Sequence, residues 1–170
     1  MFPPSAFAMV VAIGYQENNR VRAHQCERAR SKGYHLVSWV SPRAHVPTSC
    51  TIGANCVVMD GASVQPHARL GDDVFLWNGA VVGHHAVIGN HCWLSSNCTV
   101  SSTATVEPYC FVGVNAVIGH GITLGADSIV GAGAVVTHTT DPGGVYIVPD
   151  TQRFRLDSRH FMKISRIVGP

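Results

Sequence analysis

The fold is decided by residues 46–141, which divide into blocks of six: VPTSCT IGANCV VMDGAS VQPHAR LGDDVF LWNGAV VGHHAV IGNHCW LSSNCT VSSTAT VEPYCF VGVNAV IGHGIT LGADSI VGAGAV VTHTTD. An aliphatic residue opens all sixteen blocks, and no insertion interrupts the period. The openers are Val46, Ile52, Val58, Val64, Leu70, Leu76, Val82, Ile88, Leu94, Val100, Val106, Val112, Ile118, Leu124, Val130 and Val136. A register held over this length predicts a repeat architecture.

A period of six with short, glycine-punctuated strands is typical of a parallel β-helix. We expect the openers to fill its interior. The fifth place of most blocks carries a small side chain, and we expect these residues to fit the narrow corners. Five of the six cysteines, at positions 50, 56, 92, 98 and 110, occupy this fifth place. They are therefore predicted to be buried structural thiols rather than nucleophiles or metal ligands.

The chain carries little charge. Asp, Glu, Lys and Arg make up 13% of its 170 residues, against about 25% in an average soluble domain. Residues 74–106 contain no formal charge, but they include polar residues and no run of about 18 apolar residues, so a transmembrane helix is excluded. Residues 44–150 carry a net charge of −6, which argues against a nucleic-acid-binding surface there.

Residues 1–43 predict a partial Rossmann-like β-α-β segment. Its elements are a buried strand over 9–14, a helix that Asn18 or Asn19 caps and that runs to Lys32, and a strand over 34–40. Gly33 is expected to end the helix. The helix is basic, and we interpret its arginines as a solvated face in preference to phosphate contacts. The segment opens with no basic region or cleavage site, so it is not read as a signal peptide.

The solenoid domain is predicted to span residues 44–150. The turn DPGG after residue 140 breaks the repeat, and residues 145–148 add a last strand. Residues 151–170 carry a net charge of +4 and predict a basic tail, in which 153–166 form a short helix or a packed segment.

Two features of the solenoid favour chemistry or binding. His84 and His85 occupy the third and fourth places of one block, where side chains point outward or lie near a corner. Histidine has an ordinary pKa near 6.5, which suits it to take a proton from a hydroxyl or amine; a surface histidine pair is the plain alternative. Phe75, Trp93 and Phe111 recur every eighteen residues and predict an aromatic ladder, which is either a subunit interface or a ligand wall.

The stretches VQPHARLGDDVFLWNGAVVGHHAVIGNHCWLSS and FVGVNAVIGHGITLGADSIVGAGAVV, with the upstream VAIGYQENNRVRAHQCERARSKGYHLVSWVSPRAHV, resemble the NeuD/PglD-type bacterial sugar acetyltransferases. The resemblance covers about residues 9–148. It implies a left-handed parallel β-helix of three blocks per coil. The family's general base lies five residues before the glycine of the following block, and counting back from Gly89 gives His84.

The resemblance also implies the reaction and its partners. Acetyl-CoA would be the co-substrate, with no metal, and the acceptor would be the amine or hydroxyl of a sugar or a nucleotide-linked sugar. The expected acetyl-CoA contacts are Trp93, Ser102, Val114 and Ala132, in a cleft between the subunits of a cytoplasmic homotrimer, and Asn78 is a candidate acceptor contact. No nucleic acid and no membrane span are expected.

This chain departs from the family at three places. His85 stands where the family often has an acidic residue after the base. Trp93 replaces a histidine that some members place near the thioester. The glycine-rich turn of the family's nucleotide-binding domain is absent from the sequence, so the resemblance does not carry over the family's usual route for binding a nucleotide sugar.

Two other functions fit a solenoid of this kind. One is a structural β-helix without catalysis, which would neither bind acetyl-CoA nor depend on His84. The other is a zinc-dependent carbonic anhydrase of the γ type, which needs three histidines. His85 and His120 are 35 residues apart, as two of those ligands require, but the third position falls on Gly125.

Overall fold

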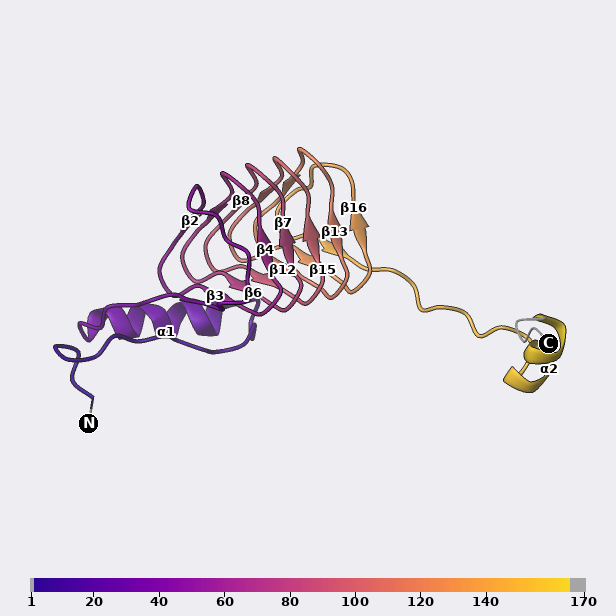
Figure 1. The fold of residues 1–170 in the computed structure, drawn as a ribbon, viewed down its shortest axis with the longest axis horizontal. Coiled ribbons are helices and arrows are strands. Elements are labelled where there is room, and N and C mark those ends of the chain that lie inside the picture. The colour runs from indigo at the N-terminus through magenta and orange to yellow at the C-terminus, as the bar shows by residue number, and fades with distance from the viewer. Residues whose placement is uncertain (1, 166–170) are drawn as a thin grey trace.

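The computed structural model describes residues 2–165 of the chain. Its main body is a solenoid of three parallel sheets with strands of two residues each (Figure 1). Sheet I contains seven strands: β1 (Trp39–Val40), β3 (Val57–Val58), β6 (Phe75–Leu76), β9 (Trp93–Leu94), β12 (Phe111–Val112), β15 (Ile129–Val130) and β17 (Val145–Tyr146). Sheet II contains five: β4 (Ser63–Val64), β7 (Val81–Val82), β10 (Thr99–Val100), β13 (Val117–Ile118) and β16 (Val135–Val136). Sheet III also contains five: β2 (Thr51–Ile52), β5 (Arg69–Leu70), β8 (Val87–Ile88), β11 (Thr105–Val106) and β14 (Thr123–Leu124).

The register of the sheets follows directly from the period of six. Phe75 pairs with Trp93, and Trp93 pairs with Phe111, so that one coil takes eighteen residues. Each coil places one block in each sheet, and the cross-section is a triangle. The predicted parallel β-helix is therefore confirmed. The last pairing, Ile129 with Val145, spans sixteen residues because the DPGG turn shortens the final coil.

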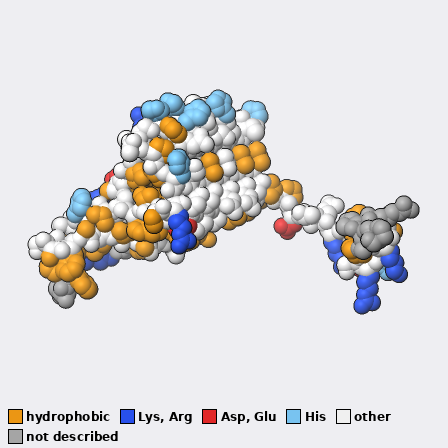
Figure 2. All heavy atoms as spheres, in the orientation of Figure 1, with side chains coloured by type: hydrophobic (Ala, Val, Ile, Leu, Met, Phe, Trp, Pro, Cys, Tyr) orange, Lys and Arg blue, Asp and Glu red, His pale blue; other side chains and the backbone are white. Residues whose placement is uncertain are grey.

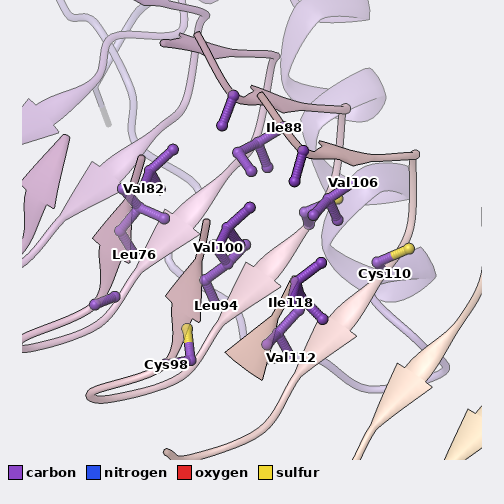
Figure 3. Close-up of a cluster of buried hydrophobic side chains, with 14 of the residues drawn as sticks. Leu76, Val82, Ile88, Leu94, Cys98, Val100, Val106, Cys110, Val112 and Ile118 are labelled. Carbon is purple, nitrogen blue, oxygen red and sulfur yellow. The ribbon is translucent and has the colours of Figure 1, made fainter. Parts of the chain in front are cut away.

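The interior of the triangle is filled by the block openers. All of them except Val46 and Ile52 are buried, and the small fifth-place residues pack beside them. Figure 3 shows this core, with Leu76, Val82, Ile88 and the openers above them stacked along the axis. Each buried Val, Leu or Ile contributes about 1.5–3 kcal/mol relative to an exposed side chain. The core of the solenoid is thus the direct product of the aliphatic repeat.

Each corner of the triangle requires a left-handed backbone conformation, which was not predicted from the sequence. The fourth residue of all fourteen blocks opened by residues 52–130 has a positive φ, between 56° and 71°. Glycine, Asn, Asp and His tolerate this left-handed conformation better than other residues, and they occupy twelve of these fourteen places. The remaining two are Thr103 and Tyr109, with φ of 59° and 62°.

The N-terminal segment holds the predicted helix but little of the predicted strands. Helix α1 spans Arg20–Ser31, and Gly33 follows it with a φ of 84°. Asn19 precedes the helix without a side-chain capping bond. The strand predicted over 9–14 is wrong except for one bridge between Met9 and Leu36. In its place, the backbone N–H of Val11 donates to the side chain of Asn55 over 2.7 Å, and the amide of Asn55 donates back to the Val11 carbonyl over 3.2 Å.

The strand predicted over 34–40 is shorter than expected. Only β1 forms a ladder, and it pairs with β3 as the first strand of sheet I. This part of the N-terminal segment is therefore continuous with the solenoid sheet. The division of the chain at residues 43 and 44 remains a proposal.

At the C-terminal end, the strand predicted over 145–148 is confirmed as the shorter β17. Beyond it the chain runs away from the solenoid to helix α2 (Ser158–Ser165) (Figure 1). Most side chains from 149 to 164 are exposed, so the tail is helical rather than packed. Within residues 2–165, neither helix has the length and apolar character needed to cross a bilayer.

Candidate active site

The triangular coil has three edges, which we name by the sheets they join. The II–III edge is formed by the residues that follow each strand of sheet II and lead to the next strand of sheet III. Five exposed histidines lie at its third and fourth block places: His67, His84, His85, His120 and His138. Figure 2 shows histidine side chains gathered along one edge of the solenoid. This edge is opposite sheet I, because a triangle places each edge across from one face.

His84 and His85 contact each other on this edge. The Nδ1 atoms of the two rings lie 3.1 Å apart, and the ring planes are nearly perpendicular, at 87°. The backbone of the pair is held by the neighbouring coils. His84 donates its N–H to Gln65 Oε1 over 3.1 Å, and its carbonyl accepts from the N–H of Thr103 over 2.9 Å. The sequence predicted both histidines on the surface, but their mutual contact and the role of Gln65 were not anticipated.

The ring of His67 packs against that of His85 from the coil below, with centroids 4.9 Å apart and an angle of 36° between the planes. The two histidines are eighteen residues apart, so successive coils bring their rings together. This packing fixes one side of the His85 ring. The three histidines form a continuous chain of contacts from His67 through His85 to His84.

Ser102 lies one coil above His84 on the same edge, since the two occupy the same block place eighteen residues apart. Gly83 permits this approach: a Cβ added there would lie 2.4 Å from the backbone nitrogen of Ser102. Any other residue at position 83 would push the two coils apart. The structure therefore places Ser102, among the predicted acetyl-CoA contacts, beside the predicted base.

The aromatic ladder of sheet I is covered by the chain's own N-terminal segment. The guanidinium of Arg22 lies 4.5 Å from the ring centroid of Phe75 and 5.5 Å from that of Trp93. Tyr15 packs on Trp93 and on Phe111, with centroids 5.2 Å and 4.7 Å apart. Phe75 and Trp93 are 5% and 7% exposed. The ladder is thus largely an intrachain packing surface, an outcome that neither predicted alternative included.

Trp93 nevertheless remains a wall of two hollows. The first, of about 350 Å³, extends from Tyr15 and Trp93 across Phe111 to Val114 and Ala132. The second, of about 360 Å³, is apolar and lies between residues 12–14 and sheet I, where Trp77 and Trp93 separate it from the first. The predicted acetyl-CoA contacts Trp93, Val114 and Ala132 are therefore brought together in one hollow.

The I–II edge beside this hollow is apolar and carries backbone donors that are unpaired within the described part of the chain. Its outward residues Val114, Ala132 and Gly133 are small or apolar, and both Val114 and Ala132 are exposed. Neither the backbone N–H of Val114 nor that of Ala132 donates to an acceptor within residues 2–165. An amide-bearing, largely aliphatic arm would find there both apolar contact and free hydrogen-bond donors.

Asn78 occupies the same edge, two coils away from Val114. Its exposed amide donates to the carbonyl of Asp60 over 3.3 Å. The structure places it in line with Val114 and Ala132 rather than with His84, although one block separates it from His84 in sequence. A single chain thus separates the predicted site into two groups. His84, His85 and Ser102 lie on the II–III edge, and Asn78, Trp93, Val114 and Ala132 lie on sheet I or the I–II edge.

The third edge, III–I, is occupied by helix α1. Arg22 is fully buried and donates to Asp73 through Nε over 2.8 Å, and Asp73 also accepts from Asn55 and contacts His91. Arg20 pairs with Asp127 over 2.6 Å, and Arg30 with Asp72 over 2.9 Å. The solvated-face interpretation of this helix is wrong for Arg22, which is fully buried. Arg20 and Arg30 keep exposed surface while they pair with carboxylates of the solenoid. Phosphate contacts are equally unsupported for Arg22, since it has no exposed surface.

Four of the five cysteines predicted to be buried, at positions 56, 92, 98 and 110, are buried, whereas Cys50 is only partly buried. Cys26 of helix α1 is buried as well. Burial raises the pKa of Cys26 and Cys98 to about 12 and that of Cys56 to about 11, which disfavours their reactive thiolate forms. Within residues 2–165, no three His, Cys, Asp or Glu side chains converge into a metal-binding group.

Three comparisons place this geometry among known proteins. The family model described as "Bacterial transferase hexapeptide (six repeats)" matches residues 49–84, 67–102 and 103–138. None of the proteins of curated function that were compared matches the sequence significantly. Among solved structures, PerB from Caulobacter crescentus, in complex with CoA and GDP-perosamine, is 33% identical with a TM-score of 0.78. The match covers 82% of this chain and 66% of PerB, so the chain spans slightly less than two thirds of that relative.

A second solved structure is the acetyltransferase domain of PglB from Neisseria gonorrhoeae FA1090 in complex with acetyl coenzyme A. It is 30% identical, with a TM-score of 0.79, and the match covers 84% of this chain and 68% of that domain. A third is a mutant of perosamine N-acetyltransferase from Caulobacter crescentus, 33% identical with a TM-score of 0.78, covering 82% of this chain and 65% of that one.

Proposed function

Because this chain belongs to the bacterial transferase hexapeptide family, we propose that it is an acetyl-CoA-dependent acetyltransferase acting on the amine or hydroxyl of a sugar or nucleotide-linked sugar. The similarity to two acetyltransferases solved with CoA or acetyl-CoA supports this activity. The observation that carries the proposal is the position of His84: an exposed, backbone-anchored histidine on a charge-poor coil, with small residues around it.

His84 acts as the general base in this proposal. It takes the proton of the acceptor as the acceptor's lone pair attacks the thioester carbonyl, and a backbone N–H stabilises the developing oxyanion. Collapse of the tetrahedral intermediate expels the CoA thiolate, which is protonated in turn by His84. Direct transfer of this kind requires no acyl-enzyme, which agrees with the burial of five of the six thiols.

The complete site requires two copies of the chain. His84 and Ser102 on the II–III edge of one copy would face Trp93, Val114, Ala132 and Asn78 of another. A ring of copies related by rotation repeats this contact at every interface, and a homotrimer is the smallest ring that gives each triangular coil two neighbours. Acetyl-CoA would lie in the cleft, with its pantetheine arm along the I–II edge. A cytoplasmic location forms part of the same proposal.

We specify the acceptor only as the amine or hydroxyl group of a sugar. PerB was solved with GDP-perosamine, but the 170-residue sequence contains no glycine-rich turn of the kind that binds a nucleotide. The hollow between residues 12–14 and sheet I offers an apolar surface near Trp77 and Trp93 for part of an acceptor.

The experiment is an acetyl-transfer assay with acetyl-CoA and a panel of amino sugars, sugar alcohols and their nucleotide derivatives. Thiol release and the mass of the product are followed for the wild type and for His84→Ala. We expect at least one acceptor to gain an acetyl group and His84→Ala to lose the reaction. Absence of acetyl-CoA binding and of transfer to every acceptor would instead indicate a structural β-helix.

A further inference from the structure

We propose that His85 is the proton partner of His84: it fixes the tautomer that leaves Nε2 of His84 free and accepts the Nδ1 proton during catalysis. This inference rests on the proposed function and assigns His85 as a positioning residue, since it acts through His84. It accounts for the histidine at the place where the resembling family often has a carboxylate.

The short distance between the two Nδ1 atoms indicates a hydrogen bond between the rings. The two Nδ1 atoms lie 3.1 Å apart. A neutral imidazole has one N–H donor and one acceptor nitrogen, so at this distance one Nδ1 must donate and the other accept. If His84 donates, its Nε2 keeps a free lone pair and can act as a base. If His85 donates, Nε2 of His84 carries the proton and cannot act as a base.

The backbone holds the pair in this contact. His85 lies at a corner with φ of 59° and donates its N–H to the Pro66 carbonyl over 3.2 Å, while Gln65 and Thr103 bind the backbone of His84. The ring of His67 packs against the ring of His85. The pair is therefore anchored to the coils on both sides and does not depend on a flexible loop.

The groups around the pair offer no counter-charge. The contacts from the coil below come from Gln65 and His67, and those from the coil above from Thr103; Arg69 is the nearest charged residue in sequence on the coil below. Within residues 2–165, no ion pair joins either ring of the pair to a carboxylate. No carboxylate within this part of the chain therefore stabilises a positive charge formed on His84, and the adjoining proton acceptor is His85.

The proton transfers balance. The acceptor's proton goes to Nε2 of His84 while its lone pair forms the bond to the acyl carbon, and the Nδ1 proton of His84 crosses to Nδ1 of His85. His84 is then neutral and His85 is an imidazolium. When the C–S bond breaks, the electron pair stays on sulfur, and the thiolate takes the Nε2 proton. The Nδ1 proton returns from His85 to His84, which restores the starting state.

Two substitutions separate this role from a structural one. His85→Asn keeps an acceptor oxygen for the Nδ1–H but cannot take the proton, and His85→Asp supplies a permanent negative charge. Both fit the corner, because Asn and Asp already occupy the same block place at Asn55, Asp73, Asn97, Asn115 and Asp127, all with positive φ. His24→Asn, on the exposed face of α1, is the control for removing a histidine elsewhere.

The kinetic test compares kcat, the KM for acetyl-CoA and the pH profile of kcat/KM. We expect His85→Asn to lower kcat by about 10–100-fold, the range seen when the partner that orients a metal-binding histidine is removed, with KM and the His24→Asn control unchanged. We expect His85→Asp to recover activity and to move the acid limb up by about one pH unit or more, since an adjacent carboxylate stabilises the imidazolium. If wild-type kcat and pH profile persist in both variants while His84→Ala is inactive, the proton-partner role is wrong and the proposed function stands.

A measurement without turnover keeps the inference independent of the acceptor. In protein labelled with ¹⁵N-histidine, the nitrogen shifts of His84 report which ring nitrogen carries the proton. We expect a protonated Nδ1 and a free Nε2 near neutral pH, a pattern that His85→Asn preserves and His85→Phe abolishes. A proton found on Nε2 of His84 in the wild type would overturn the inference, whatever the enzyme assay gives.

Discussion

Arg22 donates from Nε to Oδ1 of Asp73 over 2.8 Å, and neither side chain has any exposed surface. Asp73 is a corner residue of the solenoid, and Arg22 comes from helix α1, so this pair joins two segments far apart in sequence. Asn19 accepts from the same guanidinium over 3.1 Å, and Phe75 packs beneath it. The pair is therefore the centre of the contact between the helix and the solenoid.

Replacing Arg22 with alanine should destabilise the protein strongly. It would leave the carboxylate of Asp73 buried without its cation, and breaking a buried pair in this way costs about 3–5 kcal/mol. Arg20→Ala is the matched control on the same helix, because its pair with Asp127 is exposed and screened by water. Denaturant unfolding of both variants checks the prediction, and equal midpoints for the two would contradict it.

Thr103 has a strained backbone conformation at the II–III edge. Its φ is 59°, a conformation that a β-branched residue adopts at a cost, and Asn or Gly fills the same place in other blocks. Thr103→Asn should therefore stabilise the protein by about 1 kcal/mol. Thermal unfolding measures the change, with Asn97→Thr as the reverse substitution at an equivalent corner of the I–II edge. A loss of stability in Thr103→Asn would show that the threonine contributes more than its backbone costs.

The raised pKa values of the buried thiols predict how the stability of the protein changes at alkaline pH. The pKa of Cys98 is raised by burial from about 9 to about 12. The folded protein therefore holds this proton more tightly than the unfolded chain, so stability is unaffected below pH 9 and falls as the pH rises from 9 towards 12. Cys98→Ala, which introduces the residue found at many fifth places, should make the alkaline fall shallower. Identical slopes for the two proteins in unfolding experiments at pH 8–11 would contradict this cause.

The period of six made the architecture predictable from sequence. An aliphatic opener every six residues can be buried only if each block adds one strand to a coil, so the register, core and buried cysteines followed. The helix of the N-terminal segment was also predictable, because Gly33 ends it with a positive φ, although Asn19 makes no side-chain capping bond at its start. The strands beside it were not, because Asn55 supplies from a solenoid corner the hydrogen bonds that a neighbouring strand would have given to Val11.

The corner conformation leaves a signal in the sequence that was not used: the fourth block place is filled mostly by Gly, Asn, Asp and His. Asn97 and Asn115, with Gly79 and Gly133, share this place and a positive φ. The burial of Arg22 had no signal in sequence, since an arginine in a basic helix resembles any solvated residue. The division of the site between two edges was likewise hidden, because residues close in sequence, such as Asn78 and His84, turn a corner and face different directions.

That division predicts complementation between two inactive variants. His84→Asn removes the base on one edge, and Ala132→Trp obstructs the hollow on the other. In a mixed trimer, one interface of three combines an intact edge from each variant, so random mixing should restore about a quarter of wild-type activity. Co-refolding of the two variants, followed by the acetyl-transfer assay, measures this. A mixture no more active than its separate components would place the whole site within one chain.

The most direct test of the central claim is the turnover number of His84→Asn with acetyl-CoA and the best acceptor. Loss of a general base costs about 10²–10⁴-fold in rate. The KM for acetyl-CoA should stay unchanged, because three of the predicted acetyl-CoA contacts, Trp93, Val114 and Ala132, lie away from the II–III edge and the variant leaves Ser102 in place. We therefore expect kcat to fall by that factor at constant KM for acetyl-CoA, with a native circular dichroism spectrum. Wild-type turnover in a folded His84→Asn protein would contradict the assignment of His84 as the base.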